Sequence, residues 1–170
     1  MSGKDLSTLH KFNGWRSDSC GELITSIDDG WVEWLSSEGD LGEEVLSGLQ
    51  LVHHGSVLPK GAGQGCRYDR RKKFRTRKTI VEGLPLERFV GPDGLMMLFS
   101  LLADGSLPRG EILELAKRVQ VPGYELARDL SADLTSSNAV SQVLGHRCYL
   151  QLEIREMIAL RCHPLRSPGE

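Results

Sequence analysis

The pattern of apolar and polar positions predicts short helices in the first third of the chain. Trp31, Trp34 and Leu35 fall on one face of a helical repeat. Serine and aspartate residues that can cap helices stand before this segment and at the start of the preceding one. Glycines recur through the region and weaken every helix in it. The predicted helices cover residues 17–27, 30–37 and 43–49.

The middle of the chain is predicted to be mainly helical. Ser106, Pro108 and Glu111 combine a cap, an early proline and an acid in the first turn, which together mark a helix start. Pro122 and Gly123 end that helix. The other predicted elements are, in order, a strand over 50–58, a flexible loop over 59–65, a turn over 91–94, and helices over 95–103, 124–134 and 138–144.

The C-terminal region shows a different repeat. From Cys148 to Cys162, seven of the eight even-numbered residues are apolar, whereas the odd-numbered ones are mostly polar. This alternation favours a half-buried strand, or a hairpin bent near Glu156. A helix stays open as the alternative, because the segment is rich in helix-forming residues. The predicted fold class is α+β, with short N-terminal helices, a basic edge strand or arm, a helical middle and a C-terminal antiparallel strand or hairpin.

Composition limits the size of the core. The 170-residue chain is 39% hydrophobic and only 6% aromatic, which predicts one small domain over 12–162 with flexible tails at 1–11 and 163–170. The N-terminus opens polar, and the longest apolar stretch, 95–103, is about half the length of a membrane span. We therefore expect a soluble protein of a reducing compartment, cytoplasmic or nuclear and not secreted, with free thiols.

Charge is the most informative feature of the sequence. Residues 67–78 hold eight of the 21 basic side chains and one acid, for a net charge of +7. Residues 1–66 carry a net charge of −6 and residues 79–170 one of −3. Cations this dense need water or an anionic partner. Because basic residues stand at both odd and even positions of the tract, both faces of a strand there would be charged. We therefore expect an exposed edge strand or loop arm, within an arm spanning 59–80.

The basic tract predicts binding to nucleic-acid phosphates. Arginine forks match phosphate oxygens, and the two aromatic residues between the cations can stack on bases. A nuclear-import signal has the same composition and stays open, as do a solvated surface and a face that binds anionic lipid. The predicted binding residues are Arg67, Tyr68, Arg70, Arg71, Lys72, Lys73, Phe74, Arg75, Arg77 and Lys78.

Two short motifs add a family resemblance. Trp31-x-Glu33-Trp34 and Arg67-Tyr68-Asp69-Arg70, seven identical residues in all, resemble a spacing in the tombusvirus-type small-RNA-binding silencing suppressors. In that family, tryptophans of an N-terminal helix stack on the ends of a short RNA duplex. The resemblance implies that Trp31 and Trp34 are end-stackers, and that Arg67 and Arg70 lie near the RNA backbone. Packing of both indoles onto the domain is the alternative.

Cysteine and histidine residues offer two further hypotheses. Cys20 stands near a predicted helix start and could act as a nucleophile with His146 or His163. Metal binding would need His53 and His54 with Cys66, or the C-terminal pair of cysteines with His163. The four-ligand spacing of structural zinc sites is absent, and adjacent histidines on a strand point to opposite faces, so we expect no metal and no cofactor. The glycine-rich residues 61–65 lack the lysine of a phosphate-binding loop.

The leading hypothesis is a non-enzymatic RNA-binding regulatory protein, of the kind found among viral suppressors of RNA silencing. The alternative is a protein-interaction adaptor that binds an import receptor through the tract and other partners through the helices at 95–119. The third hypothesis is a hydrolase with Cys20 as its nucleophile. RNA is favoured over DNA, and the sequence leaves strandedness and homodimerisation open.

Overall fold

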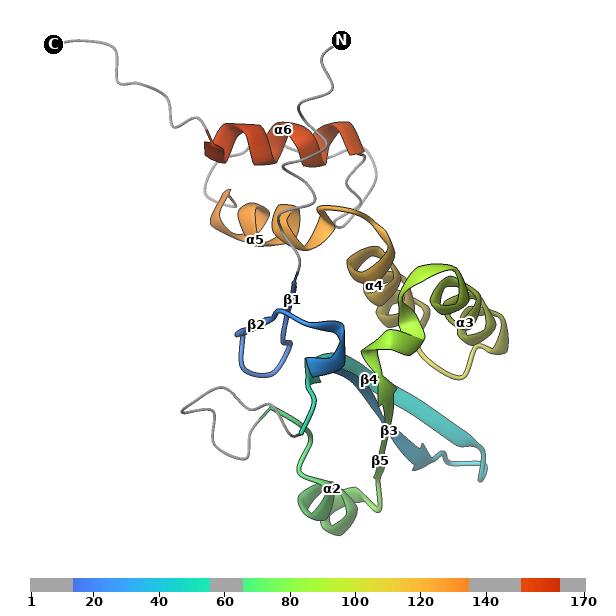
Figure 1. Cartoon of the computed structure of the whole chain (residues 1–170). Coiled ribbons are helices and arrows are strands. Elements are labelled where there is room, and N and C mark those ends of the chain that lie inside the picture. Colours follow the sequence, from blue (N-terminus) through green and yellow to red (C-terminus); the bar gives the residue numbers. More distant parts are fainter. Residues whose placement is uncertain (1–13, 56–65, 135–150, 163–170) are drawn as a thin grey trace, which may run out of the picture. The chain divides into compact units, whose positions relative to one another are not determined.

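The computed structural model describes residues 14–55, 66–134 and 151–162 (Figure 1). It divides the chain into two compact units, Asn13–Val121 and a second unit formed by Met1–Phe12 with Pro122–Glu170. The single domain predicted over 12–162 stays a prediction. The predicted tails, the loop at 59–65 and the helix at 138–144 lie outside the described residues.

The described residues form both helices and antiparallel strands, which confirms the α+β class. The second unit contains two described helices, α5 (Tyr124–Leu134) and α6 (Gln151–Cys162). The 13–121 unit contains β1 (Trp15–Arg16), β2 (Leu23–Ile24), η1 (Ile27–Asp29), β3 (Gly30–Glu38), β4 (Glu44–His53), α2 (Arg70–Arg77), β5 (Ile80–Pro85), η2 (Leu86–Phe89), α3 (Gly91–Asp104) and α4 (Arg109–Gln120).

An antiparallel three-stranded sheet organises the 13–121 unit. Its strand order is β4-β3-β5, so the long strand β3 is central. Trp31 in β3 lies opposite Val52 of β4 and Pro85 of β5. A bulge between Glu33 and Leu35 interrupts the pairing with β4. Strands β1 and β2 form a separate small antiparallel pair.

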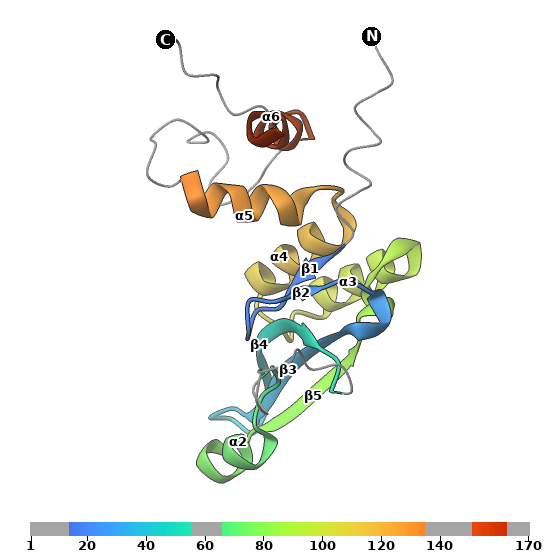
Figure 2. The same cartoon turned by 60° about the vertical axis from the view of Figure 1, so that its left-hand side comes forward.

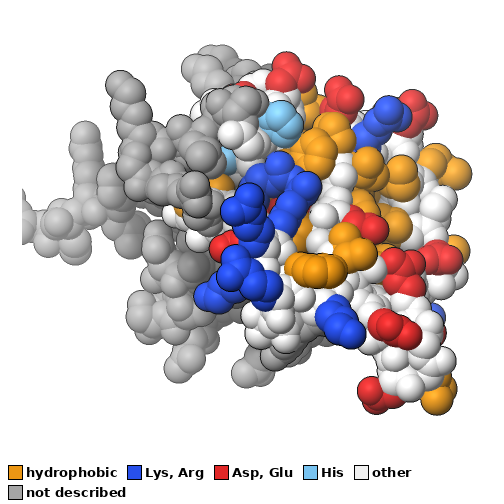
Figure 3. Space-filling view, turned by 90° about the horizontal axis from the view of Figure 1, so that it is seen from below, with side chains coloured by type: hydrophobic (Ala, Val, Ile, Leu, Met, Phe, Trp, Pro, Cys, Tyr) orange, Lys and Arg blue, Asp and Glu red, His pale blue; other side chains and the backbone are white. Residues whose placement is uncertain are grey.

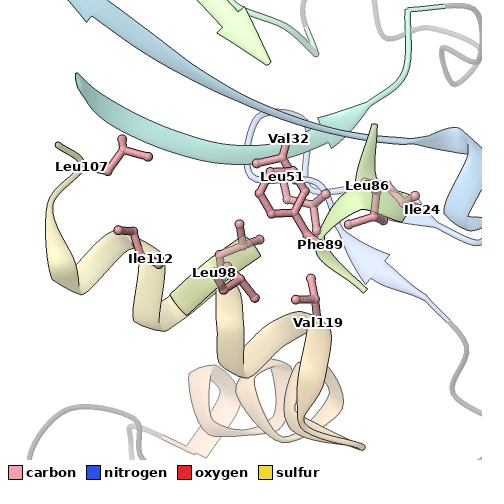
Figure 4. Close-up of a cluster of buried hydrophobic side chains, with 10 residues drawn as sticks. Ile24, Val32, Leu51, Leu86, Phe89, Leu98, Leu107, Ile112 and Val119 are labelled. Carbon is pink, nitrogen blue, oxygen red and sulfur yellow. The ribbon is translucent and has the colours of Figure 1, made fainter. Parts of the chain in front are cut away.

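One face of the sheet carries the hydrophobic core. Val32 of β3 and Leu51 of β4 pack with Phe89 of η2, Leu98 of α3 and Ile112 of α4, and all five side chains are buried (Figure 4). Two views of the chain show α2 at the end of this unit that lies away from α3 and α4 (Figures 1 and 2). The basic segment is therefore held apart from the core.

The prediction of three N-terminal helices is wrong. Residues 30–37 and 43–49 lie mainly in β3 and β4, and 17–27 contains a turn, β2 and the start of η1. Trp34 packs against the core while Trp31 contacts Arg67 on the other face of β3. A strand that is covered on both faces carries apolar residues at both odd and even positions. Its sequence therefore lacks the alternation of apolar and polar residues that marks a half-exposed strand.

Two further predictions about chain conformation are wrong. The basic tract is neither a strand nor a loop arm: its residues 70–77 form helix α2. The C-terminal segment is the helix α6, which was the alternative, and not a strand or hairpin. Among the α6 side chains that the structure describes, Ile154, Met157 and Ile158 are buried, at the i, i+3, i+4 spacing of a helix face. Ile154 and Ile158 are also even-numbered, so the helix face coincides in part with the alternation that predicted a strand.

The helical middle is confirmed. Helix α4 starts after Pro108 and ends before Pro122, and α5 covers the predicted residues 124–134. Helix α3 begins at Gly91, so the predicted turn at 91–94 forms its first turn, with Pro92 in a position where no helical N–H is lost. The strand predicted at 50–58 is confirmed only as far as His53, where β4 ends. Residues 54–55 are described and are not part of the strand, and 56–58 lie outside the described residues.

Candidate nucleic-acid interface

Helix α2 concentrates the positive charge of the chain. Six of its eight residues are lysine or arginine. Asp69 caps its N-terminus by accepting a hydrogen bond from the Lys72 N–H at 2.9 Å. At the other end Lys78 adopts a left-handed conformation with φ of 50°. Figure 3 shows basic side chains gathered on this face of the molecule, next to an apolar strip.

Four of the described cations of α2 point into solvent. Arg70, Arg71, Lys72 and Arg75 are exposed, and Lys73 lies 4.6 Å from the centre of the Tyr68 ring. In the part of the chain that the structure describes, no carboxylate pairs with these four exposed cations or with Lys78. The Arg77 side chain lies outside the described structure. The helix thus presents uncompensated charge.

Phe74 is the aromatic member of this surface. Its side chain is 59% exposed on a helix whose other residues are nearly all basic or polar. An exposed ring among cations can stack on a base or cover a sugar. The prediction for Phe74 therefore stays open and is compatible with its position.

Arg67 belongs to a different environment from the rest of the tract. Its Nε donates to Glu33 Oε2 at 3.2 Å, and its guanidinium lies 4.8 Å from the centre of the Trp31 ring. The Glu33 side chain is completely buried, and it also accepts hydrogen bonds from Gln50 Nε2 and from the Tyr68 N–H, each at 2.7 Å. A carboxylate of the fold itself neutralises Arg67, so we exclude this arginine from the candidate interface.

Tyr68 anchors the tract to the sheet. Its hydroxyl donates to the Gly48 carbonyl of β4 at 2.9 Å. Burial raises the pKa of Tyr68, and the nearby carboxylates of Glu33, Glu111 and Asp18 raise it further. Gly48 has a φ of 68°, and a Cβ there would come within 2.8 Å of the Tyr68 hydroxyl. Tyr68 is therefore a packing residue in this conformation.

The two tryptophans lie on a strand and not on an N-terminal helix. Because they are three residues apart, they point to opposite faces of β3. Trp31 contacts Arg67 and has the ring of His54 at 5.2 Å. Trp34 packs against the core and donates from Nε1 to Glu82 at 3.1 Å. The structure does not bring them together on the surface formed by α2, and their end-stacking role stays a prediction.

The structure brings together His53 and Cys66, which the sequence had grouped as possible metal ligands, with Cys20, which it had not. The Sγ atom of Cys20 lies 3.5 Å from Nδ1 of His53, and Cys66 completes the group. The sequence had linked Cys20 to His146 or His163, which both lie outside the described residues, as does Cys148. The structure also leaves the Cys162 side chain undescribed. No local motif joins Cys20 to the other two positions, so only the fold reveals its place in the cluster.

The two thiols of the cluster differ in character. Burial alone would raise the pKa of Cys20, but hydrogen bonds with the Ser17 hydroxyl, the Glu22 backbone and the Cys66 thiol bring it below its ordinary value. Burial raises the pKa of Cys66 to about 11, and its contact with Cys20 contributes to the rise. The pair would therefore lose its first proton from Cys20.

Comparisons with known proteins identify no relative: no protein-family model, curated protein or solved structure matches the chain. The resemblance to the tombusvirus-type suppressors accordingly stays a prediction. Within the described residues, no helix is both long enough and apolar enough to cross a bilayer.

Proposed function

We propose that this chain is a non-enzymatic RNA-binding protein that contacts the phosphate backbone through α2 and Lys78. The observation that carries the proposal is the run of exposed cations on α2, for which the described part of the fold supplies no carboxylate partner. Of the cations in the tombusvirus-type resemblance, Arg70 lies in this exposed run, and the resemblance extends the proposal to RNA and to suppression of RNA silencing.

Contacts with phosphates account for this surface better than base recognition does. An eight-residue helix is about 12 Å long, and basic side chains surround it on all sides. Cations distributed in this way offer no defined set of donors and acceptors to base edges. We therefore expect binding that depends on charge and on the shape of the RNA, as is usual for duplex RNA.

Charge-matched variants test the proposal. Arg71→Gln/Lys72→Gln removes two charges from α2, and Arg88→Gln/Arg109→Gln removes two exposed charges elsewhere. Glutamine keeps the helix propensity of the residues it replaces. In mobility shifts with duplex RNA across a salt series, the α2 variant should bind at least tenfold more weakly, and the slope of log K against log salt should fall by about 2. The control should match the wild type within about twofold.

Three results would contradict the proposal. One is equal weakening by the two variants, which would mean that only net charge matters. Another is binding by the wild type that does not vary with salt. The third is the absence of any shift at low salt.

A second candidate function has one observation in its favour. Helix α3 exposes Met96 by 63% and Phe99 by 52%, one helical turn apart. Exposed apolar pairs of this kind occur at protein-binding surfaces. We propose an adaptor with a partner on α3 as the alternative. Met96→Ser/Phe99→Ser should leave RNA binding unchanged if the first proposal holds, so the two functions are separable.

A further inference from the structure

Three side chains that are far apart in the sequence converge at one side of the sheet. Cys20 comes from the turn between β1 and β2, His53 is the last residue of β4, and Cys66 directly precedes the basic tract. One potential ligand atom from each lies within 4.8 Å of the other two. His53 and Cys66 are buried, and Cys20 is partly buried. The group is therefore a formed cluster of soft donors and not a set of surface residues.

We propose that Cys20 Sγ, Cys66 Sγ and His53 Nδ1 bind a Zn²⁺ ion. Thiolates and imidazole are the ligands that zinc prefers, and two cysteines with one histidine is a known ligand set. Ligands of a tetrahedral zinc ion lie about 3.6–3.8 Å apart at normal bond lengths. The 3.5 Å from Cys20 Sγ to His53 Nδ1 already fits this separation. Because no pair is wider than 4.8 Å, the largest closure required is about 1.2 Å.

The histidine is oriented for this role. Its Nε2 lies 3.4 Å from the Leu23 carbonyl oxygen, which can only accept a hydrogen bond. The proton of a neutral His53 therefore belongs on Nε2, and Nδ1 keeps its lone pair toward Cys20. A ligand histidine whose second nitrogen donates to a carbonyl is the usual arrangement around protein-bound metals.

The turn that carries Cys20 is fixed before any ion binds. The Asp18 N–H donates to the Leu51 carbonyl at 2.8 Å, and the Leu51 N–H donates to Asp18 Oδ2 at 2.7 Å. Arg118 of α4 holds the same carboxylate at 2.7 Å. The Ser17 hydroxyl accepts from the Cys20 N–H. Binding therefore requires little ordering of the chain, which favours affinity.

The zinc site gives the buried Cys66 thiol a direct role. A cysteine–histidine pair for catalysis needs only Cys20 and His53, and the Cys66 thiol would act there only indirectly, through its hydrogen bond with Cys20. As a ligand, Cys66 ties the start of the segment 66–69 to β4, just before Tyr68 contacts Glu33 and Asp69 caps α2. Three protein ligands leave the fourth position for water.

Cobalt titration of the full-length, reduced protein tests the site. Co²⁺ is expected to bind one per chain, with strong visible bands from tetrahedral geometry and a near-ultraviolet band from thiolate coordination. Zn²⁺ should displace it. Cys20→Ser, Cys66→Ser and His53→Gln should each weaken binding by at least tenfold. The matched controls are His54→Gln, which changes the adjacent histidine beside Trp31, and Cys148→Ser/Cys162→Ser; both should bind like the wild type.

A second measurement uses the wild type alone, in case a ligand variant does not fold. Zn²⁺ should slow alkylation of Cys20 and Cys66, located by peptide mapping, at least tenfold. Unchanged alkylation of both cysteines, or cobalt bands that persist in folded Cys20→Ser or Cys66→Ser, would overturn the proposal. Fast alkylation of Cys20 that zinc does not slow would support the nucleophile instead. Neither readout involves RNA, so this proposal and the proposed function can fail independently.

Discussion

At the scale of single residues, Glu33 decides which end of the basic tract reaches solvent. A carboxylate at the centre of a sheet is costly to bury unless donors surround it. Here Gln50, Arg67 and the Tyr68 backbone supply the donors. These bonds hold residues 67–68 against the sheet, and they neutralise one of the eight cations of the tract, Arg67. The remaining basic residues follow on a helix outside the core.

Removing the charge of Glu33 should destabilise the fold. Glu33→Gln leaves Arg67 without its counter-charge and turns an amide N–H₂ toward existing donors. We expect a loss of about 3 kcal/mol in the free energy of unfolding, the lower end of the range for a broken buried pair, because Arg67 keeps part of its side chain exposed. Urea unfolding of the wild type and the variant measures this difference in the free energy of unfolding.

The matched control for that experiment lies on the same strand. Glu38 is exposed at the end of β3, and Glu38→Gln should change stability by less than about 0.5 kcal/mol. Similar small losses in both variants would show that Glu33 does not hold the segment 67–68 in place.

At the scale of elements, α2 is a helix that its own sequence disfavours. Like charges stand at i, i+3 and i, i+4 spacing along it, and no acid lies in its first turn. Eight residues are also few for an independent helix. The Asp69 cap and the anchoring of Tyr68 hold it in place. A polyanion that neutralises the cations should therefore increase its helicity.

Two substitutions at Asp69 separate the effect of the helix from that of charge. Asp69→Asn and Asp69→Ala remove the same negative charge, but asparagine can still cap the helix. If the helix matters, Asp69→Ala should bind duplex RNA about fivefold more weakly than Asp69→Asn, since a lost cap costs about 1 kcal/mol. Mobility shifts and circular dichroism measure both. Equal affinities in the two variants would mean that net charge alone governs binding.

At the scale of the whole molecule, the 13–121 unit holds both proposed sites and its own core. The buried cluster from Ile24 to Val119 lies entirely within it. Helix α2 and the cluster of Cys20, His53 and Cys66 belong to the same unit. Helices α5 and α6 contribute to neither site among the described residues.

A fragment of residues 13–121 should therefore fold and bind RNA. We expect a cooperative urea transition, because a unit with its own closed core can fold alone. Its affinity for duplex RNA should lie within about threefold of the full chain, since all cations of α2 are retained. Loss of binding by a folded fragment would place part of the interface in the second unit.

Local signals in the sequence determined the features that depend on neighbours along the chain. Pro108 and Pro122 bracket α4 because proline limits the helix conformation at its own position and the one before it. The density of cations at 67–78 predicted an exposed segment, because that much charge cannot be buried without partners. These inferences need no knowledge of distant residues.

Tertiary structure decided what depends on residues far apart. Whether 30–38 forms a strand or a helix was settled by pairing with β4 and β5, since its two covered faces hide the period. The withdrawal of Arg67 from the basic surface required Glu33, 34 residues away. Cys20, His53 and Cys66 meet only because the end of β4 lies beside the turn after β1, where the Asp18 N–H donates to the Leu51 carbonyl. Spacing along a chain reports contacts within one element, whereas a site built from three elements exists only once they pack.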